Sequence, residues 1–130
     1  MWRIDRVADK IKRGDISIGT HSMFGWGGGM LTELYGTVGF DMVWIDTEHG
    51  AIDKSTLMNM LIGCAVNNMA AFVRVAWNDK VLAKPILDMG ADGIIFPMVL
   101  DAEQARAAVA ACQYPPDGVR GWGPVRNMKY

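Results

Sequence analysis

The chain has few cysteines, almost no net charge and no long hydrophobic run, and each absence narrows the class of protein. Its 130 residues contain two cysteines, Cys64 and Cys112, too few for the disulfide framework of a small secreted domain and typical of reduced thiols. Thirteen basic and 14 acidic residues give a formal net charge of −1, so we expect neither nucleic acid nor an anionic membrane as a partner. No apolar run reaches the roughly 18 residues of a membrane span, and charges throughout residues 1–12 leave no apolar core for a signal peptide. We therefore expect one cytoplasmic domain over residues 1–130 that acts on small molecules.

Four short β-rich runs are present, and each is followed by a stretch with helical spacing. The runs are Ile16–Thr20, Met42–Ile45, Ala71–Val75 and Gly93–Pro97. We predict a lead-in helix over 1–13, four βα units over 14–114 and a loop tail over 115–130. Strict alternation of strands and helices indicates an α/β fold with a parallel sheet.

Helix-start signals accompany the last three units. Asp53 or Ser55 can cap the helix of the second unit, and Asn78 can cap the helix of the third. Asp101 with Gln104 fits a capping box for the helix of the fourth unit. Pro85 lies inside the predicted third helix, where it should produce a kink or mark a later start.

Four parallel strands covered on one side only would leave an apolar sheet face in water. A (β/α)₈ barrel takes about 250 residues, twice this length. The chain is therefore a barrel fragment, or two copies pair, or the helices cover both faces as in a small doubly wound sheet.

Ionisable residues gather where the strands end, which is the edge that carries chemistry in parallel sheets. Asp46, Glu48 and His49 follow the second strand, and an ordinary imidazole exchanges protons near neutral pH. Arg74 lies within an apolar strand, so its guanidinium needs an anionic partner. That partner is either Asp46 or Glu48 in a structural salt bridge, or a substrate carboxylate held by both guanidinium nitrogens.

Two further residues are weaker candidates. His21 follows the first predicted strand and could line a pocket or contact substrate. Asp88 lies at the end of a helix, where it opposes the helix dipole, and carries little meaning alone.

Several separate motifs, in register over about residues 14–123, resemble the HpcH/HpaI aldolase family. The motifs are Gly39-Phe40-Asp41, Trp44-Ile45-Asp46-Thr47-Glu48-His49, Val73-Arg74-Val75-Ala76-Trp77-Asn78-Asp79, Leu87-Asp88-Met89-Gly90-Ala91, Phe96-Pro97-Met98-Val99 and Tyr114-Pro115-Pro116-Asp117-Gly118-Val119-Arg120-Gly121. The resemblance implies the N-terminal half of a (β/α)₈ barrel from a homo-oligomeric class II aldolase. Members of this family cleave or form 4-hydroxy-2-oxo acids, with pyruvate and an aldehyde as the other side of the reaction.

The resemblance also implies roles for individual residues. Arg74 matches the arginine that holds the pyruvate oxygens, His49 the histidine of proton transfer, and Asp88 the aspartate thought to partner that histidine. Asp46 matches an acidic residue near the water shell of a divalent metal (Mg, Mn, Co or Zn), and His21 a pocket-lining position.

The metal is the clearest departure from the family pattern. Its ligands follow the fifth and sixth strands in the family, so this sequence contains none, and we expect the chain alone to be inactive. The alternatives are a non-catalytic, self-associating half-barrel and a small doubly wound binding module. The module is disfavoured because no phosphate-binding loop follows the first strand.

Overall fold

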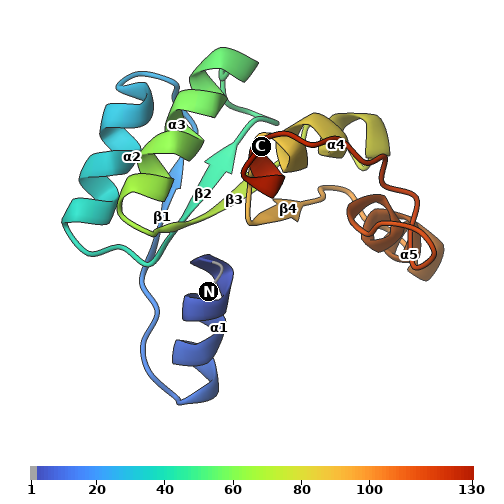
Figure 1. Cartoon of the computed structure of the whole chain (residues 1–130), viewed down its shortest axis with the longest axis horizontal. Coiled ribbons are helices and arrows are strands. Elements are labelled where there is room, and N and C mark those ends of the chain that lie inside the picture. The colour runs from blue at the N-terminus through green and yellow to red at the C-terminus, as the bar shows by residue number, and fades with distance from the viewer. Residues whose placement is uncertain (1–2) are drawn as a thin grey trace.

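The computed structural model describes residues 3–130 and contains one four-stranded parallel sheet with its connecting helices (Figure 1). The helices are α1 (Arg3–Lys12), α2 (Gly28–Thr37), α3 (Lys54–Val66), α4 (Lys80–Asp88) and α5 (Ala102–Cys112), with a 3₁₀ turn η1 (Arg126–Met128). The strands are β1 (Gly19–Ser22), β2 (Met42–Asp46), β3 (Ala70–Arg74) and β4 (Gly93–Ile95). Four βα units in sequence are thus confirmed, and the first two residues of the predicted lead-in helix lie outside the described residues.

The sheet order is β1-β2-β3-β4, and every neighbouring pair is parallel. The first strand lies later in the sequence than predicted, because backbone pairing to β2 starts only at Gly19. Ile16 and Ile18, which suggested an earlier strand, are instead 80% and 54% exposed. His21 therefore lies within β1 rather than after it.

One face of the sheet forms the hydrophobic core with the helices. Alternate residues of β2 and β3 point to this face, and Val43, Ile45, Ala71 and Val73 are fully buried there. Their partners on α3 and α4 are Leu57, Met60, Leu61, Cys64 and Ile86. Burial raises the pKa of the Cys64 thiol to about 12, as expected for an inert core cysteine.

The opposite face of the sheet is open. It carries residues in register with one another across the strands: His21 with Trp44 and Phe72, and Asp46 with Arg74 and Ile95. Trp44 is 38% exposed there, and a groove of about 490 Å³ runs along this face. Half a barrel has its helices on one side of the sheet, as seen here. The doubly wound alternative, which requires helices on both faces, is therefore wrong.

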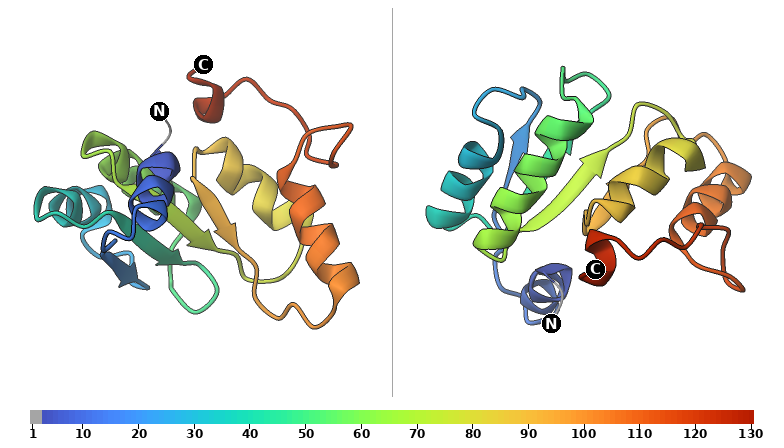
Figure 2. Two further views of the ribbon diagram at one scale, coloured as in Figure 1. Left: turned by 90° about the horizontal axis from the view of Figure 1, so that it is seen from below. Right: turned by 45° about the horizontal axis from the view of Figure 1, so that its top comes forward.

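The amino ends of the strands are closed by α1. Arg3 Nε lies 2.8 Å from Asp92 Oδ2, and Lys10 Nζ lies 2.7 Å from Asp41 Oδ1. Each of these aspartates also accepts a backbone hydrogen bond: Asp92 from Ala71 N of β3, and Asp41 from Ile18 N, just before β1. Helix α1 and the turn η1 lie close together at this end of the sheet (Figure 2), which leaves the carboxyl end for the connecting loops.

The helix starts follow the predicted capping chemistry with one correction. Asp53 accepts from Thr56 N at 2.7 Å, and Asp101 accepts from Gln104 N at 2.8 Å. The cap of α4 is Asp79 rather than Asn78, because the Asp79 side chain accepts from Val81 N at 2.7 Å. Pro85 lies inside α4, which starts at Lys80, so the proline does not mark the start of the helix. No helix of the described chain is long and apolar enough to cross a membrane.

Candidate active site

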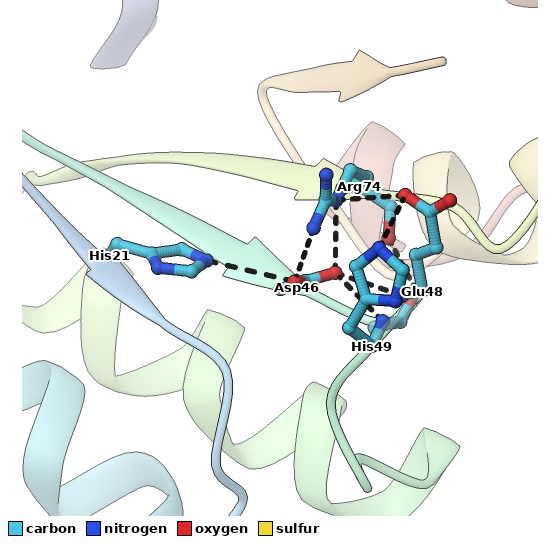
Figure 3. Close-up of polar contacts among 6 residues, drawn as sticks. His21, Asp46, Glu48, His49 and Arg74 are labelled. Carbon is cyan, nitrogen blue, oxygen red and sulfur yellow. Dashed lines mark hydrogen bonds and ion pairs between the residues drawn. The ribbon is translucent and has the colours of Figure 1, made fainter. Parts of the chain in front are cut away.

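Five ionisable residues that the sequence singled out converge at the carboxyl end of β1, β2 and β3, on or beside the open face. Asp46 and Arg74 end β2 and β3 and are paired in register, while His21 lies on the neighbouring β1 (Figure 3). His49 and Glu48 reach the same place from the turn that follows β2 (Figure 3). Parallel pairing explains this convergence, because the ends of adjacent strands must meet at one edge.

Asp46 is the centre of the cluster. Its carboxylate is fully buried and accepts hydrogen bonds from Arg74 Nε (3.0 Å) and Nη2 (2.5 Å). It also accepts from the backbone N–H groups of Glu48 (2.9 Å) and His49 (3.2 Å). Burial alone would raise the pKa of Asp46, but these four donors outweigh it and lower the pKa to about 2. Asp46 is therefore ionised at neutral pH and fixes both Arg74 and the turn.

Arg74 presents two different edges. The Nε–Nη2 edge is occupied by Asp46, and this pairing raises the pKa of Arg74. Within the described residues, no acceptor is hydrogen-bonded to Nη1. The guanidinium carbon lies 5.0 Å from the centre of the Trp44 ring, and the side chain is 20% exposed. The Nη1–Nη2 edge is thus available to a second anion, so a structural salt bridge and a substrate contact are compatible.

Glu48 and His49 flank the guanidinium. Glu48 Oε2 lies 3.1 Å from Arg74 Nε and 3.8 Å from His49 Nε2. The Glu48 side chain is only 16% exposed, whereas that of His49 is 63% exposed. His49 can therefore reach a ligand on the open side of Arg74.

His21 completes the cluster from β1. Its Nε2 lies 3.7 Å from Asp46 Oδ2, and its ring centre lies 4.9 Å from that of Trp44. With an exposure of 42%, its side chain lines the groove of the open face.

The structure adds two residues that the sequence did not single out. Trp44 contacts both His21 and Arg74, and its position two residues before Asp46 on the same strand was the signal that could have found it. A side chain on Gly50 would collide with the backbone oxygens of Asp46 and Met23, so only glycine lets the turn after His49 pack this tightly.

Comparison with known proteins assigns the family. The family model described as HpcH/HpaI aldolase/citrate lyase matches residues 29–129. The chain belongs to this family. A 4-hydroxy-2-oxo-heptane-1,7-dioate aldolase of Salmonella paratyphi B is 40% identical over 115 residues, which are 88% of this chain and 43% of the relative.

Two solved structures agree with the half-barrel. An HpcH/HpaI aldolase from Desulfitobacterium hafniense DCB-2 superposes with a TM-score of 0.80 at 27% identity, covering 90% of this chain and 45% of that one. Citrate synthase SbnG superposes with a TM-score of 0.79 at 31% identity, covering 92% of this chain and 48% of that one. The chain thus spans less than half the length of these relatives, as one half of a (β/α)₈ barrel.

Asp88 is the predicted site residue that the structure does not bring to the cluster. Helix α4 runs back from the end of β3 to the start of β4, so its last residue lies near the amino ends of the strands. There Asp88 Oδ1 accepts from Arg120 Nη2 at 3.0 Å. Within this chain Asp88 is not the partner of His49.

The family resemblance implies a metal ion, but the described residues do not form a site for one. No group of three or more His, Cys, Asp and Glu side chains is arranged to hold one in residues 3–130. Both oxygens of Asp46 are already occupied by Arg74 and the two backbone N–H groups. The residues present therefore do not fit a metal centre.

Proposed function

We propose that this chain carries the oxo-acid-binding and proton-transfer part of a carbon–carbon lyase. The reaction is aldol cleavage or condensation of 4-hydroxy-2-oxo acids, with pyruvate and an aldehyde as the other side. The observation that supports it best is Arg74, whose one edge is fixed by buried Asp46 while its other edge faces the open side beside His49.

The guanidinium would bind the carboxylate and keto oxygens of the substrate. A planar cation with two parallel N–H groups matches a pair of oxygens, and it opposes the negative charge of the enolate that cleavage produces. Because Asp46 holds the guanidinium in advance, little reorganisation is needed when this charge develops.

His49 would move the proton. It takes the proton of the C4 hydroxyl, the carbonyl of the aldehyde forms, and the C3–C4 bond breaks with its electron pair passing to the C2 oxygen of the enolate. The imidazolium then returns the proton to C3, which yields pyruvate. The 63% exposure of His49 leaves it able to approach substrate.

Other parts of the assignment remain proposals. Dependence on a divalent metal (Mg, Mn, Co or Zn) would require ligands beyond the described residues. A cytoplasmic location and a homo-oligomeric assembly are proposed with the family. His21 would line the pocket for the aldehyde end. Asp88 is paired with Arg120 within this chain, so it would take part in catalysis only through a contact with another chain of the assembly.

Pyruvate binding to the purified chain tests the proposal. In ¹H–¹⁵N NMR, pyruvate should shift the Arg74 Nη–H and Trp44 indole signals, because the guanidinium and the indole ring lie together on the open face of the sheet. Arg74→Lys replaces the planar guanidinium and its two parallel N–H groups with a single ammonium group, so it should weaken pyruvate binding at least about tenfold. Arg13→Lys is the matched control, since Arg13 pairs with Asp15 on the surface, away from the cluster. The proposal fails if pyruvate moves neither signal or binds Arg74→Lys equally well.

A second role, non-catalytic self-association, is favoured by the open sheet face. Trp44 and the groove lined by Met42, Phe72 and Ile95 are left partly exposed, and both β1 and β4 have an unpaired edge within the described sheet. A monomer at micromolar concentration in sedimentation analysis would exclude this role.

A further inference from the structure

Glu48 has an oxygen atom that neither the fold nor the proposed function explains. Glu48 Oε2 is buried and accepts no hydrogen bond from the described residues, although Arg74 Nε is only 3.1 Å away. The Nε–H bond of Arg74 is directed at Asp46 Oδ1 instead. A buried carboxylate oxygen without a donor is costly, so a donor that satisfies it would be retained.

A further donor group beside this oxygen is the imidazole of His49. Its Nε2 lies 3.8 Å from the same Oε2 atom, and its exposed ring can rotate without displacing core atoms. Within this chain Asp88, which the family resemblance offered as the partner, is paired with Arg120.

The charges of the cluster favour the same pairing. Asp46 and Glu48 carry two negative charges against the one positive charge of Arg74, so one negative charge remains while both imidazoles are neutral. A proton taken up by His49 cancels this charge directly beside Glu48. The carboxylate thus stabilises the imidazolium that proton abstraction creates.

We propose that Glu48 is the positioning residue for His49. Its carboxylate accepts the hydrogen of Nε2, which orients the ring and leaves Nδ1 as the atom that takes a proton from the substrate. This inference rests on the proposed function for the identity of that proton, but the pairing itself is a property of the unliganded chain.

The two histidines of the chain make the pairing directly observable. Two-bond ¹H–¹⁵N NMR at pH 8 reports which ring nitrogen carries hydrogen, and His21→Gln assigns the signals. We expect His49 to carry hydrogen on Nε2 in the unaltered chain. Glu48→Met, which removes both acceptor oxygens, should shift it toward a mixture of tautomers. Glu48→Gln should restore the Nε2–H form, since its amide oxygen still accepts.

Glu33→Met is the matched control, because Glu33 is an exposed glutamate on α2, and it should leave His49 unchanged. A reciprocal experiment does not depend on folding of the Glu48 variants. His49→Gln should move the ¹³C carboxylate signal of Glu48 and leave those of the other two glutamates, Glu33 and Glu103, in place.

An unchanged His49 tautomer in Glu48→Met, or an unchanged Glu48 signal in His49→Gln, overturns the pairing. Failure of pyruvate to bind at Arg74 overturns the proposed function but leaves both of these measurements intact. The two proposals can therefore fail separately.

Discussion

Asp46→Asn is the substitution that tests most directly what holds the site together. It keeps the volume of the side chain and one acceptor oxygen for the turn, but it removes the negative charge that pairs with Arg74. Breaking a buried ion pair costs about 3–5 kcal/mol because the remaining charge is left uncompensated. Arg74 is 20% exposed and still has Glu48 beside it, so we expect a loss of about 2–4 kcal/mol at pH 7.

The pH dependence supplies an independent estimate. A carboxyl pKa lowered from 3.8 to about 2 stabilises the folded state by about 2 kcal/mol where Asp46 is ionised in both states. Because the pKa of the folded state is the lower one, this contribution is complete well above pH 4. It falls to about half near pH 3 and nearly vanishes at pH 2.

Urea unfolding followed by tryptophan fluorescence at pH 7, 4 and 3 measures both quantities. The difference in the free energy of unfolding between the unaltered chain and Asp46→Asn should shrink as the pH falls. The reasoning is refuted if the variant loses less than about 1 kcal/mol at pH 7. It is refuted equally if the difference stays constant down to pH 3.

Two further substitutions test the scaffold. Asp41→Asn should lower stability by about 1–3 kcal/mol, since the buried carboxylate binds Lys10 and Ile18 N and its pKa is lowered despite burial; an unfolding titration unaffected by the change would contradict this role. Leu61→Ala should lower the free energy of unfolding by about 2–5 kcal/mol, because Leu61 is fully buried in the core between α3 and the sheet. A loss below about 1 kcal/mol in the same assay would mean that the neighbouring side chains fill the cavity, and it would contradict this estimate.

The order of elements followed from the sequence, whereas some of their ends did not. Buried parallel strands read as apolar runs, which located β2, β3 and β4 correctly. The first strand was misplaced because Ile16 and Ile18 are apolar but exposed, and only pairing with β2 determines where β1 begins. Likewise Asn78 and Asp79 are both good caps, and local chemistry alone could not decide between them.

The candidate site was predictable to the extent that strand ends define it. Asp46, His49 and Arg74 follow from the rule that parallel sheets carry chemistry at their carboxyl ends. The contacts of Glu48 and Trp44 depend on side-chain packing across β2 and β3, which spacing does not encode. Asp88 shows where a motif match misleads. The match gave Asp88 a partnership with His49, but α4 carries Asp88 away from the cluster to a pairing with Arg120.

The buried position of Asp46 determines how this site could work. An anion that is already paired with Arg74 and with two backbone N–H groups needs no substrate to organise it. The same carboxylate therefore fixes the guanidinium that would hold the oxo acid and the turn that carries Glu48 and His49. Because one buried group determines both orientations, a change at Asp46 should disturb binding and proton transfer together. A change at Glu48 should disturb proton transfer more than binding, because Asp46 still holds the guanidinium.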